Sequence, residues 1–308
     1  MKLRPLECLC EIRRSEFNLS RAAGRLHASQ PAVTRQIQLL EQELGFEVLV
    51  RRRNKVVGLS PQGEAVIARA ERILYEAEQL RRVGEELRSP VAGRLVVATT
   101  HIHARYTLLK AIKPFRLRYP GVSFSIQSGD PSSIAQLVAT GQADLGISVE
   151  STERHPELVS LPCYPIGRVV ITPVRHPLLR LKRKPTLEDL AQYPIIVYDR
   201  RFSGGLRIVE AFERRGLAPD VVLTATDAEV IKAYVAEGLG IAAIQSLAYS
   251  ASRDVGLRAI DADHLFGKPV AVITVRRGVF LPRYTYDFLR LLAPKLTAGD
   301  IDRMLSER

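Results

Sequence analysis

The period of the hydrophobic pattern changes at residues 88–93, and this change constrains the fold more than any other feature. Before it, apolar residues recur at helical spacing over 3–14, 21–26, 29–44 and 61–87. After it, short apolar strands alternate with amphipathic helices. The segment itself, RSPVAG, contains Pro and Gly and is typical of a hinge. The sequence therefore predicts a helical N-terminal part followed by a larger α/β part.

The first three helices predict a helix-turn-helix. Asn18 or Ser20 is placed to cap the short second helix. Ser29 is placed to cap the third helix, and Pro31 lies in its first turn, where a missing N–H costs nothing. Gly45 follows the last apolar position and suits the left-handed end of that helix.

A basic β-hairpin is predicted after the third helix. Residues 48–50 and 56–59 are short apolar strands, joined by the turn 51–55 with three adjacent arginines and a lysine. Such a run is costly to place anywhere except in water or against anions. The formal net charge is +12, and residues 1–60 hold 11 Lys and Arg against 6 Glu. Together, the hairpin and the charge predict a winged helix-turn-helix that binds nucleic acid.

The amino-terminal turn of helix 29–44 predicts the DNA-reading surface, because this turn of a helix-turn-helix enters the major groove. Gln pairs with adenine, Arg with guanine, and the methyl groups of Ala and Thr contact thymine. The alternative is a solvated helix start with ordinary capping. The predicted DNA-binding residues are Ser29, Gln30, Pro31, Ala32, Thr34 and Arg35 in this turn, and Arg51, Arg52, Arg53 and Lys55 in the hairpin.

The long helix 61–87 carries a heptad repeat. Val66, Ile73, Leu80 and Leu87 recur every seven residues, and small residues follow at the same period. This pattern predicts a coiled-coil seam between two chains. The alternative is an amphipathic helix that packs on its own domain.

The rest of the chain predicts a two-lobed α/β clamp. A strand–helix–strand–helix–strand order indicates a parallel sheet, and a second such set begins near residue 164. Strand 269–278 and helix 284–295 close the chain. The predicted domains are a winged helix-turn-helix at 1–60, a dimerisation helix at 61–90 and an effector domain at 91–308, with lobe I at 91–163 and 269–308 and lobe II at 164–268.

Three strand-to-helix junctions predict a ligand site between the lobes. Thr99 and Thr100 end one strand, Ser203 opens a glycine-containing helix, and Thr226 forms a capping-box pattern with Glu229. Helix N-termini favour anions, and ligands of such folds bind at the carboxyl ends of the strands. Each junction alone is explained by helix capping; together they predict one shared cleft.

Residues 20–64 resemble the winged helix-turn-helix of LysR-type transcriptional regulators. The resemblance rests on the pairs Ala22-Ala23, Leu40-Glu41 and Leu44-Gly45, the run SQPA at 29–32, and Leu59-Ser60-Pro61 with Gly63. It covers nearly the whole chain and narrows to the CysB-like subgroup through RYPGVSF, LPCYP, LAQYP and TATDAEVIKAYVAEGLGIAAI. This resemblance implies a homotetrameric activator of sulfur-assimilation genes, controlled by a small sulfur metabolite or inorganic anion.

The resemblance also implies where the effector binds. The sulfate cleft of the subgroup uses Thr and Gln side chains, which match Thr100, Ile102, His103, Val149 and Ser203 here. Ile102 and Val149 lack a hydroxyl, and His103 replaces a glutamine. Fewer donors weaken sulfate binding, so a larger and partly apolar anion is expected. His103 supplies a donor, and a charge if it is protonated, while Arg200 and Arg201 are placed to turn inward.

Several classes of protein are excluded. No apolar run approaches the roughly 18 residues of a membrane span, and the three cysteines form no CxxC pair. Nucleophile-elbow, phosphate-loop and dinucleotide motifs are absent, and no metal site or cofactor is implied. A cytoplasmic, non-enzymatic regulator is expected, with promoter DNA, RNA polymerase, a small anionic metabolite and copies of itself as partners. The alternatives are a LysR-type regulator of an unrelated pathway that responds to an organic acid, and a solute-binding module.

Overall fold

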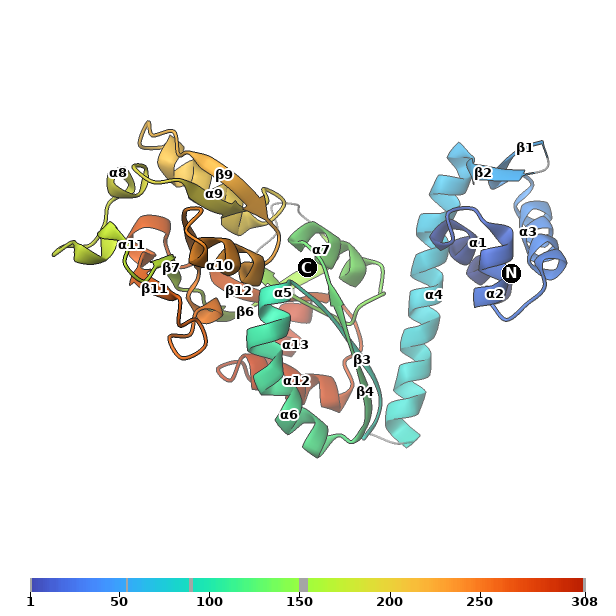
Figure 1. Ribbon diagram of the computed structural model, residues 1–308. Coiled ribbons are helices and arrows are strands. Elements are labelled where there is room, and N and C mark those ends of the chain that lie inside the picture. The colour runs from blue at the N-terminus through green and yellow to red at the C-terminus, as the bar shows by residue number, and fades with distance from the viewer. Residues whose placement is uncertain (1, 54, 89–90, 150–154, 307–308) are drawn as a thin grey trace. The chain divides into compact units, whose positions relative to one another are not determined.

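The computed structural model describes residues 2–53, 55–88, 91–149 and 155–306 (Figure 1). Asn54 in the predicted basic turn and Ser89 and Pro90 in the predicted hinge lie outside the described residues. The chain divides into two compact units, Met1–Gly84 and Glu85–Arg308.

The first unit contains the predicted helix-turn-helix. Its helices are α1 (Leu3–Arg14), α2 (Leu19–Arg25) and α3 (Gln30–Leu44). Asn18, not Ser20, caps α2, because its side chain accepts a hydrogen bond from the backbone N–H of Arg21. The helix therefore starts two residues earlier than predicted. Gly45 ends α3 with a φ of 79°, in the left-handed region. One buried cluster joins the three helices, with Leu9, Ile12, Ala22, Val33, Ile37 and Leu40 at its centre.

A two-stranded hairpin and a long helix complete the N-terminal elements. Strands β1 (Leu49–Arg52) and β2 (Lys55–Leu59) are antiparallel, so two of the arginines predicted in the turn belong to a strand. Helix α4 (Pro61–Arg88) follows. Its first turn lies so close to the hairpin that a Cβ on Gly63 would be 2.1 Å from the carbonyl oxygen of Val48.

The second unit contains two five-stranded sheets. The first has the order β4-β3-β5-β12-β6, formed by β3 (Ala92–Thr99), β4 (Gly121–Ser128), β5 (Leu145–Val149), β6 (Leu158–Pro165) and β12 (Val270–Arg276). Strands β4, β3 and β5 are parallel, and β12 and β6 are antiparallel to their neighbours. Side chains of β3 alternate. Leu95 and Val97 pack with helices α6 (Leu109–Arg118) and α12 (Arg283–Leu292), while Val96 and Ala98 pack with α7 (Pro131–Ala139).

The second sheet has the order β11-β7-β10-β8-β9, with helices on both faces. It is formed by β7 (Arg168–Pro173), β8 (Ile195–Tyr198), β9 (Val221–Ala225), β10 (Ile241–Gln245) and β11 (Leu257–Asp261). Ile208 and Phe212 of helix α9 lie on one face, and Ile231 and Val235 of α10 lie on the other. The chain crosses between the sheets after β6 and before β12, where the N–H of Ile166 donates to the carbonyl of Pro269 at 2.7 Å.

The helices of the second unit cover both sheets (Figure 1). The helical segment that follows β3 is divided into α5 (His101–His103), a π-helical turn η1 (Ala104–Leu108) and α6 (Leu109–Arg118). The others are α7 (Pro131–Ala139), α8 (Leu187–Leu190), α9 (Ser203–Glu213), α10 (Ala228–Ala236), α11 (Asp263–Phe266), α12 (Arg283–Leu292) and α13 (Ala298–Ser306), with short 3-10 turns η2 (Pro177–Arg180) and η3 (Ser246–Ala248).

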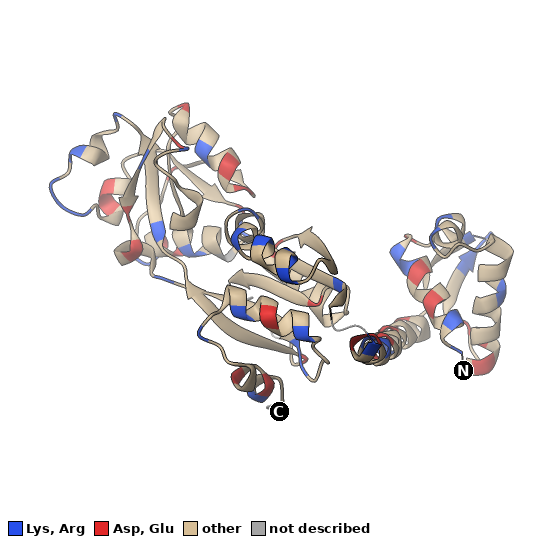
Figure 2. Ribbon diagram, turned by 90° about the horizontal axis from the view of Figure 1, so that it is seen from below, with Lys and Arg blue, Asp and Glu red and all other residues tan. Residues whose placement is uncertain are grey.

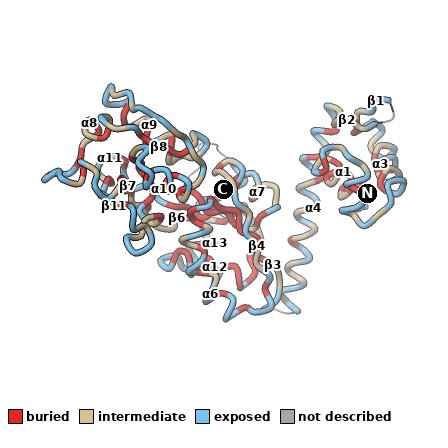
Figure 3. The backbone as a smooth tube through the Cα atoms, viewed as in Figure 1, coloured by how far each residue is buried: buried red, intermediate tan, exposed pale blue. Residues whose placement is uncertain are grey.

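These elements confirm the predicted fold class of a winged helix-turn-helix, a long helix and a two-lobed α/β domain. Figure 3 shows buried residues in the central strands of the second unit, where every residue of β5, β8 and β10 is buried, and in α1 and α3. Strands β6 and β11 and helix α13 are additional to the prediction. Among the described residues, no helix is both long enough and apolar enough to span a membrane.

Candidate functional site

The first turn of α3 presents polar groups to solvent while its other side is buried. Pro31, Ala32 and Arg35 are exposed, and Thr34 is half-buried. The hydroxyl of Ser29 accepts the N–H of Ala32 at 3.4 Å, which is the predicted N-cap.

Gln30, the first residue of α3, is held by a hydrogen bond from helix α2. Its Oε1 accepts a hydrogen bond from the Ser20 hydroxyl at 2.9 Å. Since the side-chain amide nitrogen is not used in this bond, Gln30 retains donors for a partner outside the chain.

The hairpin separates its four cations into two kinds. The guanidinium of Arg51 lies 3.1 Å from the carboxylate of Glu41, which also accepts the N–H groups of Val48 and Leu49. Arg51 therefore ties the hairpin to α3. Arg52, Arg53 and Lys55 are exposed, and none has an ion pair within the part of the chain that the structure describes. Figure 2 shows where Lys and Arg lie along the ribbon. These three exposed side chains are the cations that remain available to phosphates.

Helix α4 has two apolar stripes. Ile67 and Ala70 are buried in the core of the first unit, and Val66 packs beside them. The rest of the predicted seam is uncovered, since Leu80 is 75% exposed and Leu87 is 83% exposed.

A small cavity of about 40 Å³ lies at the carboxyl ends of the parallel strands of both sheets. Thr100 follows β3, Val149 ends β5, Tyr198 ends β8 and Gln245 ends β10. Arg168 begins β7, which is antiparallel to β10, and is paired with Gln245 in the register, so it lies at the same edge. The predicted cleft thus corresponds to a cavity that both lobes line.

Six buried polar atoms with no hydrogen-bond partner in the described residues belong to side chains that line this cavity. They are Oγ1 of Thr100, Nε2 of His103, Nε and Nη1 of Arg168, the hydroxyl of Tyr198 and Oε1 of Gln245. Each such atom costs about 1–3 kcal/mol when it is left unpaired. Their convergence on one cavity indicates a site that is completed by a bound molecule.

Arg168 sets the charge of that molecule. Its side chain is 2% exposed, and burial lowers the pKa of its guanidinium from the usual range, although an arginine remains charged at neutral pH. Asp263 accepts the backbone N–H of Arg168 at 2.6 Å, and its carboxylate lies 2.7 Å from the ammonium of Lys268. A buried guanidinium with unpaired N–H groups favours an anion.

His103 contributes a neutral imidazole. It is fully buried, and burial lowers its pKa to about 4. Its Nδ1 is 2.7 Å from the hydroxyl of Tyr164, while Nε2 has no partner. Desolvation disfavours the protonated ring, so of the two roles considered for His103, donor or cation, the structure favours the neutral donor.

The remaining lining residues are mostly apolar. Ile102, Val149, Phe202, Pro131 and Ala228 complete the wall. The site combines one buried cation and several neutral hydrogen-bonding groups with an apolar surface, which suits a small anion that carries an apolar group.

Not every predicted effector residue lies at this cavity. Thr100, Ile102, His103, Val149 and Thr226 line it. Thr99 does not, because its buried hydroxyl donates to the carbonyl of Ile147 at 2.9 Å. Arg201 does not turn inward either: it is 67% exposed and pairs with Asp199 at 3.0 Å. The side chain of Ser203 lies outside the described residues, although the next residue, Gly204, lines the cavity.

The predicted capping box at Thr226 is wrong. Asp227 caps α10 instead, and its carboxylate accepts the N–H of Glu229 at 2.7 Å. Thr226 is thereby left facing the cavity.

Arg168, Tyr198 and Gln245 were not predicted as site residues. The one signal for them is an arginine at the start of an apolar strand segment, RVVITPV.

Two glycines of α9 allow the helix to approach the site. A Cβ on Gly204 would lie 3.3 Å from Nη1 of Arg168, and a Cβ on Gly205 would lie 2.1 Å from the carbonyl oxygen of Tyr198. The backbone of α9 can therefore lie against both the buried arginine and strand β8 only because these positions lack side chains.

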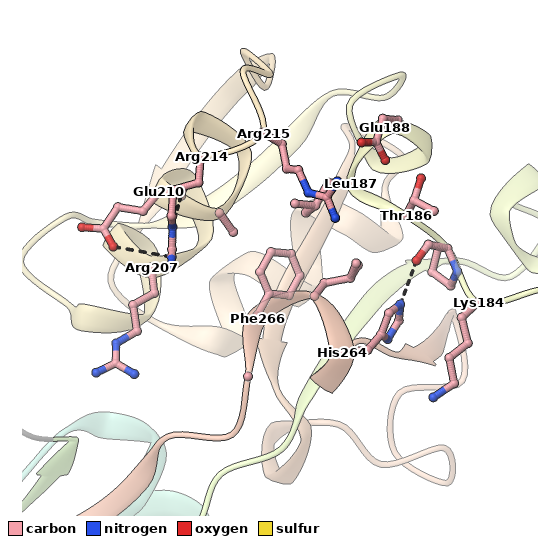
Figure 4. Close-up of a pocket in the computed structure, with 14 residues that line it drawn as sticks. Lys184, Thr186, Leu187, Glu188, Arg207, Glu210, Arg214, Arg215, His264 and Phe266 are labelled. Atoms are coloured by element: carbon pink, nitrogen blue, oxygen red, sulfur yellow. Dashed lines mark hydrogen bonds and ion pairs between the residues drawn. The ribbon is translucent and has the colours of Figure 1, made fainter.

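A larger hollow of about 850 Å³ lies between α8, α9 and α11 (Figure 4). Lys184, Arg207 and Arg215 border it and are exposed, and Glu188 and Glu210 lie among them. Exposed charges retain their hydration, and none of the described residues that line this hollow has a buried polar atom without a hydrogen-bond partner. We therefore take the small cavity between the two sheets as the candidate ligand site.

Comparison with known families covers nearly the whole chain. Residues 3–64 match the family of bacterial regulatory helix-turn-helix proteins of the lysR type, and residues 88–297 match the LysR substrate binding domain. The chain belongs to the LysR family. It is a DNA-binding transcriptional regulator with an effector-binding domain, in a family that is not enzymatic.

Full-length LysR-family relatives include regulators of one subgroup. The chain is 43% identical to the transcriptional regulator SsuR of Burkholderia cenocepacia, over 100% of this chain and 99% of that protein. It is 44% identical to CysB of the same organism, over 99% and 97%, and 38% identical to cbl of Escherichia coli, over 100% and 97%.

Solved LysR-family structures agree. The cofactor-binding domain of the Cbl regulator matches with a TM-score of 0.67 and 37% identity, over 70% of this chain and 95% of that domain. Full-length CbnR in complex with its target DNA matches with a TM-score of 0.64 and 22% identity, over 95% and 99%, which shows a shared fold.

Proposed function

We propose that this LysR-type regulator controls genes of sulfur metabolism, such as cysteine or sulfonate genes, in response to a small anion bound in the small cavity. The proposal is supported by relatives named SsuR, CysB and cbl, which are 38–44% identical over almost their entire length. It is also supported by the chain's resemblance to the CysB-like subgroup, which implies sulfur assimilation.

The work is divided along the chain. Residues 1–60 bind promoter DNA through the first turn of α3 and the exposed cations of the hairpin. Residues 61–90 assemble the protein through Ile73, Leu80 and Leu87, while Val66, the first position of the predicted seam, packs against the core of the first unit. Residues 91–308 sense the effector between lobe I (91–163 and 269–308) and lobe II (164–268).

The single observation that carries the effector proposal is Arg168, a buried guanidinium with unpaired N–H groups at the lining of the small cavity. An anion that enters would pair this charge and satisfy Thr100, Tyr198 and His103 at the same time. Because the ligand contacts both lobes, its binding free energy favours one closure of the clamp over the other.

Closure then changes transcription through the assembled protein. We propose a homotetramer built from dimers, in which a change of lobe closure alters how dimers pack and hence how bound DNA is bent and spaced. RNA polymerase is the expected partner at the promoter. Such work places the protein in the cytoplasm, on the nucleoid.

The test uses full-length protein and two readouts. Thermal unfolding is measured with sulfate, methanesulfonate, thiosulfate, N-acetylserine and benzoate, because a ligand of the folded state raises the midpoint by mass action. The best compound is repeated on Arg168→Gln and on the exposed control Arg201→Gln. We expect the shift to vanish in the first variant and to persist in the second.

The second readout is DNA binding. Affinity for the chain's own upstream region and for random duplex is measured with and without the best compound. A shift in thermal unfolding that survives Arg168→Gln places the ligand elsewhere. Equal affinity for both DNAs at physiological salt contradicts sequence-specific regulation.

A regulator of an unrelated pathway is the alternative, and the apolar wall of Ile102, Val149 and Phe202 favours it. Such a wall suits an organic acid as well as a sulfur compound. Benzoate in the same screen separates the two: a larger shift with benzoate than with every sulfur-containing anion favours this alternative.

A further inference from the structure

A chain of three side chains lies behind the imidazole of the cavity. The Tyr164 hydroxyl is 2.7 Å from Nδ1 of His103 and 2.6 Å from the hydroxyl of Thr107. The rings of His103 and Tyr164 meet edge to face, with centroids 5.9 Å apart. The opposite nitrogen of the imidazole, Nε2, is buried and belongs to the cavity lining. These contacts connect the cavity to β6, the last strand before the chain crosses to the second lobe.

The protons in this chain have one favourable order. A phenol is a better donor than an aliphatic hydroxyl, and the imidazole nitrogen is the strongest acceptor of the three groups. The Tyr164 hydroxyl therefore donates to Nδ1, and the Thr107 hydroxyl donates to Tyr164. In the opposite order, the half-buried Thr107 hydroxyl would have to donate to solvent, because it has no partner other than Tyr164 among the described residues. The favourable order leaves the second imidazole proton on Nε2.

We propose that Thr107 and Tyr164 are positioning residues that hold His103 as a neutral donor, with Nε2–H directed into the cavity, so that the cavity selects a monoanion over a dianion. The selectivity rests on the function proposed above.

The selectivity follows from counting charges. With the Nδ1 lone pair occupied by Tyr164, the ring cannot take a second proton without reversing the whole chain of hydrogen bonds. Arg168 is then the one buried cation among the lining residues of the described chain, and no carboxylate lines the cavity. The other ionisable lining groups are His101, which is exposed, and Tyr198, whose pKa is raised by burial. A dianion would leave one buried negative charge uncompensated, which is costly.

The ligand class is thus a monoanion whose other end is apolar, such as an alkyl sulfonate or a carboxylate. The donors suit its charged end, and Ile102, Val149 and Phe202 suit its apolar end. Sulfate has the wrong charge and lacks an apolar group.

The first test needs no ligand. Full-length protein labelled with ¹⁵N-histidine is examined by solid-state NMR at about pH 8, where an exposed imidazole is neutral. His103→Gln assigns the resonances by their loss. We expect a protonated Nε2 and an unprotonated, hydrogen-bonded Nδ1 in His103. A protonated Nδ1 or a doubly protonated ring overturns the proposal, whether or not an effector is ever found.

The second test compares probes by calorimetry at the same pH. We expect methanesulfonate to bind full-length protein at least about tenfold more tightly than sulfate. Equal or tighter binding of sulfate overturns the charge selection. If neither probe binds while the tautomer is as expected, the proposed function fails for this ligand class and the positioning role stands.

Variants separate positioning from general structure. Tyr164→Phe should weaken methanesulfonate binding about fivefold, because Nδ1 loses its partner and the ring its anchor. Thr107→Val should act in the same direction, and Thr107→Ser should restore binding. In the His103→Gln background, where no imidazole remains to be oriented, Tyr164→Phe should have no further effect. An equal effect of Tyr164→Phe in both backgrounds overturns the positioning role.

Discussion

At the scale of single residues, Arg168 is the most informative side chain. The guanidinium is 2% exposed and lacks a carboxylate partner in the described residues. Its burial therefore lowers the stability of the ligand-free protein, and other interactions in the fold offset this loss. Natural cores retain such a charge where a ligand pairs it. Apo stability and ligand response should therefore change in opposite directions when the charge is removed.

Arg168→Met tests this opposition. We expect the free energy of unfolding of the ligand-free second unit to rise by about 1–3 kcal/mol, because an apolar side chain replaces an unpaired buried charge. The stabilisation by an anionic effector should disappear. Urea unfolding with and without methanesulfonate measures both quantities.

The exposed Arg201 provides the control, since Arg201→Met removes the same charge from solvent. It should change neither quantity appreciably. A loss of apo stability in Arg168→Met, together with an intact ligand response, contradicts the assignment.

At the scale of elements, a polar cluster ties the π-helical turn η1 of lobe I to helix α10 of lobe II. The Tyr106 hydroxyl donates to Glu229, and the ammonium of Lys232 lies 2.8 Å from both Glu229 and Asp254. Arg105 lies 3.5 Å from the same glutamate. π-Helical turns are frequent at functional sites. This one carries Tyr106 to α10 and also Thr107 to Tyr164, so it links the closure of the lobes to the cavity.

The cluster predicts a pH dependence. Burial raises the pKa of Glu229, but hydrogen bonds from Lys232 and Tyr106 outweigh it, and the net pKa is lowered; the pKa of Asp254 is lowered in the same way. A carboxylate with a lowered pKa stabilises the fold above its unfolded-state pKa and loses that contribution as pH falls through the folded-state pKa. Stability of the second unit should therefore decline between about pH 5 and pH 3.

Glu229→Gln isolates this contribution. We expect a loss of about 1–3 kcal/mol at neutral pH, because Lys232 loses a charged partner, and a shallower decline in acid. Urea unfolding at several pH values measures both. Glu213→Gln, which removes an exposed carboxylate from the neighbouring helix α9, is the control and should match wild type. An unchanged acid profile in Glu229→Gln would show that the cluster contributes no pH-dependent stability.

The elements also show which parts of the fold can be predicted from the sequence. The helix-turn-helix was predictable because its caps and stripes are local: Ser29, Pro31 and Gly45 fix the ends of α3. Strand β6 was missed because LVSLPCYP contains two prolines, which argue against a central strand. It lies at the edge of its sheet, where a missing N–H is tolerated.

The site was predictable only where it follows local rules. Thr100 was found because strand-to-helix junctions can be recognised along the chain. Arg168 was not, because its neighbours indicate a buried strand, and only its pairing with Gln245 of β10 brings it to the cavity. Adjacent capping candidates were also ambiguous: Asp227, one residue after Thr226, forms the actual cap.

At the scale of the whole molecule, affinity for DNA should depend on which cations are free. Arg52→Ala and Lys55→Ala should each weaken binding to all duplexes and reduce the slope of log affinity against log salt by about 1. Arg35→Ala should instead reduce the preference for promoter over random DNA. Fluorescence anisotropy titrations over a range of salt concentrations measure these effects. Arg116→Ala, in α6 of the second unit, is the control and should leave the salt slope unchanged. If Arg116→Ala changes the slope while Arg52→Ala and Lys55→Ala do not, the assigned DNA-binding face is wrong.

The exposed apolar stripe of α4 predicts how the protein assembles. Ile73, Leu80 and Leu87 are 39%, 75% and 83% exposed, in a chain that buries Ile67 and Ala70 on the neighbouring stripe of the same helix. Apolar side chains at a seven-residue period gain stability when a second helix covers them, at about 25 cal/mol per Å² of apolar area. A charge placed in the seam should oppose this burial.

Leu80→Glu should therefore dissociate the protein toward monomers in sedimentation velocity, and Leu80→Glu with Leu87→Glu should do so completely. Arg81→Glu changes the charge of the adjacent, exposed position by more and should leave assembly intact. When two DNA-binding units are joined in a dimer, binding of the first half-site makes binding of the second intramolecular, so promoter affinity should fall when the dimer dissociates. The methanesulfonate response should persist. Intact assembly in the double variant, or dissociation by Arg81→Glu alone, would move the interface away from this stripe.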